Sequence, residues 1–445
     1  MPDIGREIYD LCVELFPICR SITGDGVRRT LALIARHVPD LRVHEVPTGT
    51  RCFDWTVPRE WNIADAYVLD PGGRKIIDFK QSNLHVVGYS IPVDKTVTLD
   101  ELQKHLYSLP DQPDAIPYVT SYYSESWGFC LTHSQRQALA PGDYRVVIKS
   151  SLTSGHLTYA ELILPGRSQQ EVLLSTYVCH PSLANNEISG PAVTTFLARW
   201  LAGLESRRLT YRIVFIPETI GSICYLSRNL DWLKDHVVAG FNITCVGDDL
   251  AYSYLPSRLG NTLADQAALH VLGHCHPSYA RYSFLDRGSD ERHYCSPGVD
   301  LPVVSVMRTK YRTYPEYHTS LDNLSLISPA GLAGGYEAVR KCIECVEHDR
   351  TLKTAVLCEP QLGKRGLYPN RGTGNAARQV KSMLDLLAYC DGRHTLLDVA
   401  ETIKQPMWEL LPLVETLQQA GLLVEIGEEG GPAHQPGAGA GAALA

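Results

Sequence analysis

The chain has 445 residues, of which 44% are hydrophobic, and a formal net charge of −8. This length predicts two or three domains with sizeable cores, and the scattered charges of both signs leave no basic stripe for nucleic acid and no acidic tail. No apolar run approaches the roughly 18 residues that span a bilayer, and we expect the first residues to form an amphipathic helix instead of a signal peptide.

The cysteines indicate a reducing compartment. There are 13, an odd number, in a chain for which we expect no secretory leader. Free thiols and a cytoplasmic location are therefore predicted. Cys342 and Cys345 form a CxxC pair, but no second pair follows at zinc-ribbon spacing. We expect both on one helix, without a structural metal.

The first 47 residues predict two helices and a strand. Apolar side chains recur at helical spacing over residues 4–15 and again over 27–38, and the sequence SITGDG at 21–26 separates the two runs. Residues 41–46 then alternate between apolar and polar, as in a strand.

Residues 48–149 have a different composition and pattern, which predict a small β-rich inserted domain. Short β-like runs, many prolines and three of the six tryptophans fall here. An aromatic cluster that includes Tyr123 and Trp127 either lines a substrate cleft or packs in the core of this domain.

From Tyr144 onward, strands and helices alternate, which predicts a doubly wound α/β sheet with helices on both faces. The predicted strands are 145–148, 160–164, 172–178, 211–216, 240–246 and 303–307, and the predicted helices are 190–203, 221–233, 261–273 and 329–347.

Polar residues follow three of these strands directly. His180 follows the strand at 172–178, Glu218 the strand at 211–216, and Asp248 the strand at 240–246, while His318 lies in a later loop. Glu218 and Asp248 could instead cap the next helix or turn, and His318 could be an ordinary loop histidine. Parallel strands end side by side, so we expect one crevice holding two imidazoles and two carboxylates. Such a set, with one position open to water, is typical of a catalytic zinc.

Five motifs, in this order and at these spacings, resemble the bacterial aminopeptidase-like family related to zinc-dependent exopeptidases of the aminopeptidase S type: CHPSLANNEISG, PETIGS, CVGDD, GSDERHYC and EYHTSLDN. WTVPREWNIADAYV, SNLHVVGYSIPV and IPYVTSYYSESWGFC in the inserted segment match as well. The resemblance covers about residues 1 to 430. It implies an α/β/α zinc-exopeptidase-like mixed sheet built from 1–47 and 150–350, an inserted β-rich domain at 48–149 and a winged-helix domain at 355–430.

The resemblance also implies roles for single residues. His180 matches the first zinc-binding histidine and His318 the last. Glu218 falls where the exopeptidases have a pair of glutamates, a general base and a ligand. Pro217 precedes it here, so one carboxylate remains, and we assign Glu218 as the catalytic base.

The remaining ligands depart from the exopeptidase pattern. Asp248 is our choice for the other acidic ligand, although strict alignment places Thr244 there. Asn186 occupies the position of the aspartate that bridges two zinc ions, where a neutral amide bridges poorly. Glu187 could substitute with a different geometry. We therefore predict one zinc ion instead of two, and low turnover.

Asp290 and Glu291 in GSDERHYC are predicted from the resemblance to hold a free α-amino group, with a solvated loop as the alternative. Tyr123 and Trp127 complete the predicted substrate site. The expected ligand is a small peptide or an aminoacylated small molecule, without nucleic acid or membrane.

The C-terminal part predicts a separate winged helix. Residues 380–389, 395–403 and 406–419 form three short amphipathic segments, and GLLVEIGEEGG is typical of a wing. Few lysines or arginines lie on these helices and the end is acidic, which argues against DNA binding. We expect a packing module through which the chain forms homo-oligomers, followed by a disordered tail at 431–445.

Three functions remain open at this point. The first is a zinc-dependent aminopeptidase-like hydrolase. The second is another acyl transfer, or amide formation, in a biosynthetic pathway. The third is a catalytically degenerate protein that binds a ligand or acts as a scaffold, because of Asn186.

Overall fold

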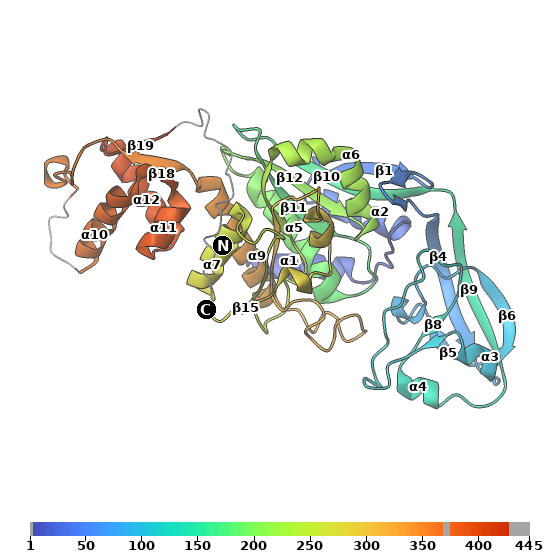
Figure 1. Cartoon of the computed structure of the whole chain (residues 1–445). Coiled ribbons are helices and arrows are strands. Elements are labelled where there is room, and N and C mark those ends of the chain that lie inside the picture. Colours follow the sequence, from blue (N-terminus) through green and yellow to red (C-terminus); the bar gives the residue numbers. More distant parts are fainter. Residues whose placement is uncertain (1–2, 368–373, 427–445) are drawn as a thin grey trace, which may run out of the picture. The chain divides into compact units, whose positions relative to one another are not determined.

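The computed structural model describes residues 3–367 and 374–426. The chain forms two compact units, Met1–Glu347 and His348–Ala445, and each is described by itself (Figure 1). The predicted tail at 431–445 lies outside the described residues. Within the described part of the chain, no helix is long and apolar enough to cross a membrane.

An eight-stranded mixed sheet forms the centre of the first unit. Its order is β1 (Arg42–Pro47), β10 (His156–Leu164), β12 (Thr210–Ile216), β11 (Glu171–Tyr177), β13 (Val237–Asn242), β16 (Val303–Met307), β14 (Ser253–Leu255) and β15 (Ala280–Arg281). The four strands from β12 to β16 run parallel, and β1, β10 and β14 pair antiparallel. The mixed α/β fold class is therefore confirmed.

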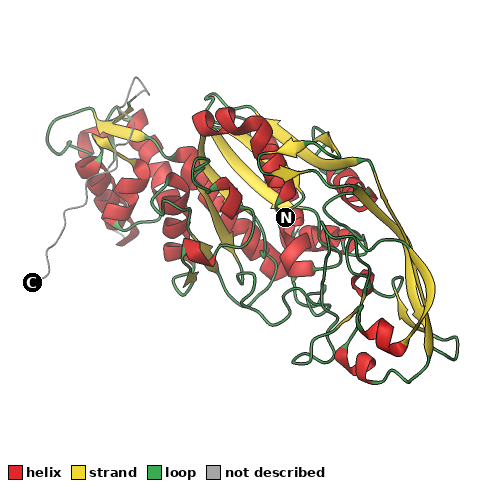
Figure 2. Ribbon diagram, turned by 45° about the vertical axis from the view of Figure 1, so that its right-hand side comes forward, coloured by secondary structure: helices red, strands yellow, loops and turns green. Residues whose placement is uncertain are grey.

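Helices cover both faces of this sheet (Figure 2). Tyr211 in β12 donates to Glu347 in α9 (Pro329–His348), whereas the next residue, Arg212, donates to Tyr225 in α6 (Ile220–His236). Because successive strand residues point to opposite faces, α9 and α6 lie on opposite sides. The other long helices of this unit are α1 (Ile4–Leu15), α2 (Asp25–Ala35), α5 (Ser189–Ala202) and α7 (Leu263–Cys275).

The central strands are buried along their whole length. Every residue of β11 and of β12 is buried, as expected for parallel strands covered on both faces. Their apolar runs were predicted within one or two residues. The strand predicted at 240–246 lies three to four residues earlier, because β13 runs from Val237 to Asn242.

A second sheet belongs to the inserted segment. It is antiparallel, in the order β5 (Lys75–Asp78), β4 (Glu60–Leu69), β9 (Asp143–Thr153) and β6 (Val93–Thr98). The strand predicted at 145–148 therefore lies here, in β9, and not in the large sheet. Shorter elements of this segment are β2 (Arg51–Cys52), β3 (Trp55–Thr56), α3 (Leu99–Gln103), β7 (Leu106–Tyr107), β8 (Phe129–Cys130) and α4 (His133–Gln137).

Backbone hydrogen bonds join the inserted segment to a loop of the α/β part. The amide of Tyr118 donates to the carbonyl of His318 at 2.8 Å, and the amide of Ser320 donates to that of Ile116 at 2.8 Å. These bonds fix one side of the site described below.

The second unit is a three-stranded sheet packed on three helices. The strands are β18 (Asp391–Thr395), β17 (Thr351–Thr354) and β19 (Leu423–Glu425), and the helices are α10 (Gly374–Tyr389), α11 (Leu396–Ile403) and α12 (Met407–Gln419). Buried leucines from each helix form its core, among them Leu386, Leu397 and Leu410. The predicted helices and the last strand are confirmed, whereas β17 and β18 were not predicted.

Candidate metal-binding active site

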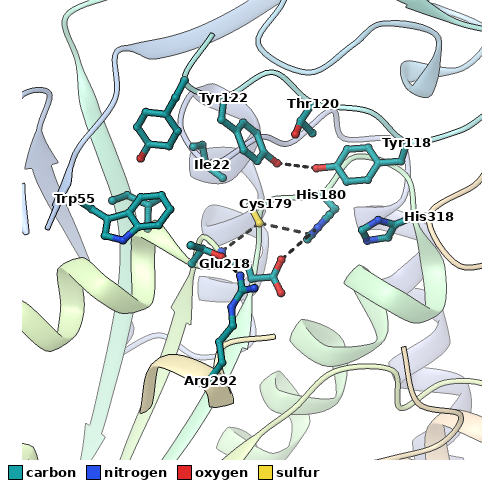
Figure 3. Close-up of a pocket in the computed structure, with 13 residues that line it drawn as sticks. Ile22, Trp55, Tyr118, Thr120, Tyr122, Cys179, His180, Glu218, Arg292 and His318 are labelled. Atoms are coloured by element: carbon teal, nitrogen blue, oxygen red, sulfur yellow. Dashed lines mark hydrogen bonds and ion pairs between the residues drawn. The ribbon is translucent and has the colours of Figure 1, made fainter. Parts of the chain in front are cut away.

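A cavity of about 350 Å³ lies where β11 and β12 end (Figure 3). The α/β part contributes most of its wall, and the inserted segment closes the other side with aromatic rings. The lining residues are Ile22, Trp55, Tyr118, Thr120, Tyr122, Tyr123, Cys179, His180, Glu218, Thr219, Ile220, Arg292 and His318.

His180 follows β11 and is oriented by a buried carboxylate. Its Nδ1 lies 2.7 Å from Oε2 of Glu187, which stands in a single π-helical turn (Ala184–Ile188) before α5. The opposite nitrogen, Nε2, lies 3.6 Å from Oε2 of Glu218. A carboxylate behind a histidine is the usual arrangement that orients a metal ligand. Burial lowers the pKa of His180 to about 3, so the imidazole is neutral, as a metal ligand must be.

Arg20 completes the shell behind His180. Its Nε donates to the carbonyl of His180 at 2.8 Å and lies 3.5 Å from Oε1 of Glu187. Burial raises the pKa of Glu187 to about 8, and Arg20 opposes this rise. Cys179, His180 and Glu187 place potential ligand atoms within 4.8 Å of one another. Because the arginine already faces this carboxylate, we interpret the group as a support for the imidazole.

His318 approaches from the loop joined to the inserted segment. Its ring centroid lies 5.5 Å from that of His180, and the Tyr118 ring lies 5.1 Å from each of them. Its Nε2 is buried and meets no hydrogen-bond partner among the residues that the structure describes. Burial also lowers the pKa of His318 to about 3. Two neutral imidazoles therefore stand side by side.

Glu218 stands where β12 ends, and its side chain is 21% exposed. The next residue, Thr219, has φ 65° and ψ −83°, a strained conformation for a β-branched residue. Its amide donates to Asp290 Oδ1 at 2.8 Å, and Nη2 of Arg292 donates to its hydroxyl at 2.6 Å. Partial burial, and then the charge of Asp290, raise the pKa of Glu218 to about 8.

The structure does not bring Asp248 into the cavity. Its carboxylate accepts four hydrogen bonds, from Asn185 Nδ2, the amide of Leu250, and the amide and hydroxyl of Thr309. The assignment of Asp248 as a metal ligand is wrong, because β13 ends six residues earlier and the chain has turned away.

The backbone amide of Asn186 is hydrogen-bonded, whereas only one of the two polar atoms of its side chain is. Its amide donates to Asp322 Oδ2 at 3.0 Å, and its Nδ2 donates to the hydroxyl of Tyr177 at 3.2 Å. Its Oδ1 is buried without a partner in the described part of the chain. The Thr244 hydroxyl lies 2.5 Å from that of Tyr177. Asp322, which we did not predict, also accepts from the amide of Asn185 at 2.6 Å and fixes this loop.

Asp290 and Glu291 do not line the cavity, and their prediction as substrate ligands is wrong. Both are fully buried. Asp290 binds the start of α6 through the amide of Thr219 and the hydroxyl of Ser222. Glu291 accepts hydrogen bonds from two backbone amides and from Tyr311.

Only one of the two predicted aromatic residues lines the cavity. Tyr123 lines the cavity, whereas Trp127 is 8% exposed and stacks on His105 with ring centroids 3.6 Å apart. Trp55, Tyr118 and Arg292 line the cavity although we did not assign them to it. A signal for Arg292 was its place directly after the acidic pair in GSDERHYC.

The donor set does not fit two zinc ions, because an amide at Asn186 and a hydroxyl at Thr244 stand where the resemblance leads us to expect bridging and terminal carboxylates. It does fit one. The centroids of two imidazoles on a common tetrahedral zinc lie about 5 Å apart when each Zn–N bond is about 2.0–2.1 Å, close to the 5.5 Å observed here. Nε2 of His318 has no hydrogen-bond partner among the described residues and is therefore available to bind this ion. The ligand atoms of His180, Glu218 and His318 are not gathered within 4.8 Å as they stand.

Sequence comparison gives two matches that together span most of the chain. The model of a family described as a domain of unknown function (DUF4910) matches residues 9–349, and a winged helix-turn-helix model matches 350–425. A protein of Clostridium acetobutylicum, provisionally named a polysaccharide biosynthesis protein with aminopeptidase-like domain, is 49% identical over 400 residues, which are 89% of this chain and 91% of that protein.

Solved structures agree with this result. A crystal structure of a provisionally named peptidase from Clostridium acetobutylicum matches with a TM-score of 0.89 and 46% identity, over 95% of this chain and 96% of that one. The zinc aminopeptidase BSAP from Bacillus subtilis matches with a TM-score of 0.57 and 13% identity, over 76% of this chain and 94% of that one. The second likeness concerns the fold alone.

Proposed function

Since the chain belongs to the family described as domain of unknown function DUF4910, with an aminopeptidase-like domain followed by a winged helix, we propose that it hydrolyses an amide bond of a small aminoacylated molecule or peptide with one divalent ion. The observation that carries this proposal is the pair of neutral imidazoles, of the buried His180 and the half-buried His318, beside Glu218 at the end of two parallel strands.

We assign the ion to Nε2 of His180 and Nε2 of His318. The unpartnered Oδ1 of Asn186 is available as a third, neutral ligand. When bound, zinc would supply Lewis acidity at the scissile carbonyl. Glu187 keeps the His180 imidazole in the tautomer whose Nε2 faces the cavity.

Glu218 moves the proton in this proposal. Its Oε2 lies beside His180 Nε2 and on the cavity wall, where it can accept a proton from the attacking water and return it to the departing nitrogen. Asp290 and Arg292 hold the strained backbone of Thr219 in place, and this fixes the direction of the neighbouring Glu218 side chain. The aromatic rings from the inserted segment line the opposite side of the cavity.

Product analysis tests this proposal. Zinc-loaded protein is incubated with a panel of aminoacyl amides, dipeptides and N-acyl amino acids, and the released amine is quantified by mass spectrometry. We expect slow turnover of at least one class, abolished by chelation and restored by zinc. No release from any member of the panel, with or without zinc, contradicts the proposal.

A ligand-binding protein without turnover is the second candidate. It is favoured by three departures from the exopeptidase pattern around the site: Pro217, Asn186 and Thr244 each lack a carboxylate. In that case, members of the panel bind in the cavity and are recovered unchanged.

Exchanging Asn186 for aspartate tests the metal count. A carboxylate can share its charge between two cations, whereas one neutral oxygen cannot offset their repulsion. We expect Asn186→Asp to raise the zinc content from one towards two per chain after dialysis, measured by elemental analysis, and to increase hydrolysis. Asn261→Asp, at an exposed position, is the matched control. Two tightly bound zinc ions in the unmodified protein would show that our interpretation of Asn186 is wrong.

A further inference from the structure

The lining of the cavity carries few charged groups. Its lining contains one guanidinium, Arg292, and one carboxylate, Glu218, which the proposed function uses for proton transfer. The remaining lining is uncharged, with four aromatic rings and two neutral imidazoles. The two carboxylates that could have received a free α-amino group, Asp290 and Glu291, are buried outside it.

Arg292 is fixed in place and keeps one end available. Its Nη2 donates to the hydroxyl of Thr219 at 2.6 Å, and its Nε donates to His293 Nε2 at 3.1 Å. Its Nη1 has no hydrogen-bond partner within the described ranges. Figure 3 shows the side chain reaching up to the Glu218 side of the cavity. A half-buried, pre-oriented guanidinium suits a carboxylate or a phosphate, because its donors match two oxygens of either group. Of these two, the carboxylate is the group that amino acids and peptides carry.

We propose that the ligand of this cavity is an amide that carries a carboxylate, bound by Arg292, and not a molecule recognised by a free α-amino group. This inference rests on the proposed function for the position of the scissile bond. A carboxylate at Arg292 lies beside the Glu218 wall, so the amide next to it faces the two imidazoles. The acyl part then extends towards Trp55 and Tyr123, which are 39% and 55% exposed and meet edge to face at 5.7 Å.

The alternative role of Arg292 is purely structural, through Thr219. Thr219→Val separates the two roles, because it removes the hydroxyl that Nη2 contacts and leaves the guanidinium and the β-branched shape. Arg292→Gln removes both the contact with Thr219 and the proposed contact with the ligand. Arg292→Lys keeps the charge but loses the planar guanidinium. Arg287→Gln makes the same change of charge at an exposed position five residues earlier, and is the matched control.

The test is a comparison of three probes: N-acetyl-L-leucine, N-acetyl-L-leucinamide and L-leucinamide. Dissociation constants are measured by titration calorimetry on the full chain, first after chelation and then with zinc. We expect N-acetyl-L-leucine to bind about ten-fold more tightly than either amide, since hydrogen bonds to charged groups stabilise more than neutral ones. The preference should persist in the Thr219→Val and Arg287→Gln proteins, fall in Arg292→Lys and vanish in Arg292→Gln.

Two results overturn the inference. One is an L-leucinamide that binds at least as tightly as N-acetyl-L-leucine, and the other is an undiminished preference in Arg292→Gln. Because the preference is measured on chelated protein, it does not depend on turnover. A carboxylate preference without any hydrolysis therefore supports the inference and contradicts the proposed function. Hydrolysis confined to L-leucinamide supports the proposed function and contradicts the inference.

Discussion

Replacing Glu218 with glutamine is expected to reduce kcat for amide hydrolysis by about 10²–10⁴-fold, the usual contribution of a general acid–base group. The amide keeps the size of the side chain but can no longer accept the proton. KM should change little, because Glu218 is not assigned to substrate binding. The fold should persist, since Asp290 and Arg292 hold the next residue, Thr219, through its amide and its hydroxyl.

The measurement is steady-state hydrolysis of the best substrate from the panel, with metal content determined on the same samples. Glu205→Gln, at an exposed position, controls for the change of charge. A Glu218→Gln protein that keeps its metal and more than half of its kcat would remove Glu218 from the chemistry. Loss of metal together with activity would make Glu218 a ligand instead of the base.

Removing the Glu187 carboxylate should strongly destabilise the protein. Its side chain and that of Arg20 are each 1% exposed, so Glu187→Ala leaves a buried guanidinium without its carboxylate. Breaking a buried ion pair in this way costs about 3–5 kcal/mol of unfolding free energy. The same change frees the imidazole of His180, and metal affinity should fall by about 10–100-fold, as for other carboxylates that orient a metal-binding histidine.

Urea unfolding at pH 9, above the pKa of about 8 at which Glu187 ionises, measures the first effect, and zinc titration measures the second. Glu205→Ala is the exposed control, with an expected change within about 0.5 kcal/mol. The double variant Arg20→Met/Glu187→Leu removes both charges and should recover most of the lost stability, since apolar replacements of a buried pair are often neutral. If Glu187→Ala lowered the unfolding free energy by less than about 1 kcal/mol, Arg20 and Glu187 would not form a buried ion pair.

The sequence predicted the part of the site that depends on sheet geometry. His180 and Glu218 each follow a strand that was predicted within two residues, and parallel neighbours end together, so their proximity follows from β11 and β12 alone. Asp248 failed under the same rule because β13 ends earlier than its apolar run, at Asn242, and Asp248 then turns into its own hydrogen-bond network.

Side-chain direction was the part that the sequence could not predict. Asp290, Glu291 and Arg292 are consecutive, and only the conformation of the short helix α8 (Glu291–Tyr294) decides which of them faces the cavity. Likewise, Tyr123 and Trp127 belong to one aromatic cluster, and composition does not separate a cavity wall from a core. The contact of Tyr118 with His318 joins residues 200 positions apart, and no local pattern encodes such a pairing.

The most direct test of the central claim is the zinc stoichiometry of the chelated and reconstituted chain, compared with the double variant His180→Ala/His318→Ala. The imidazole pair predicts one zinc ion per chain in the unmodified protein and none at this site in the double variant, with a structure that remains folded by circular dichroism. One ion that persists in the double variant, or none in the unmodified protein, would contradict the assignment of this site as a metal centre.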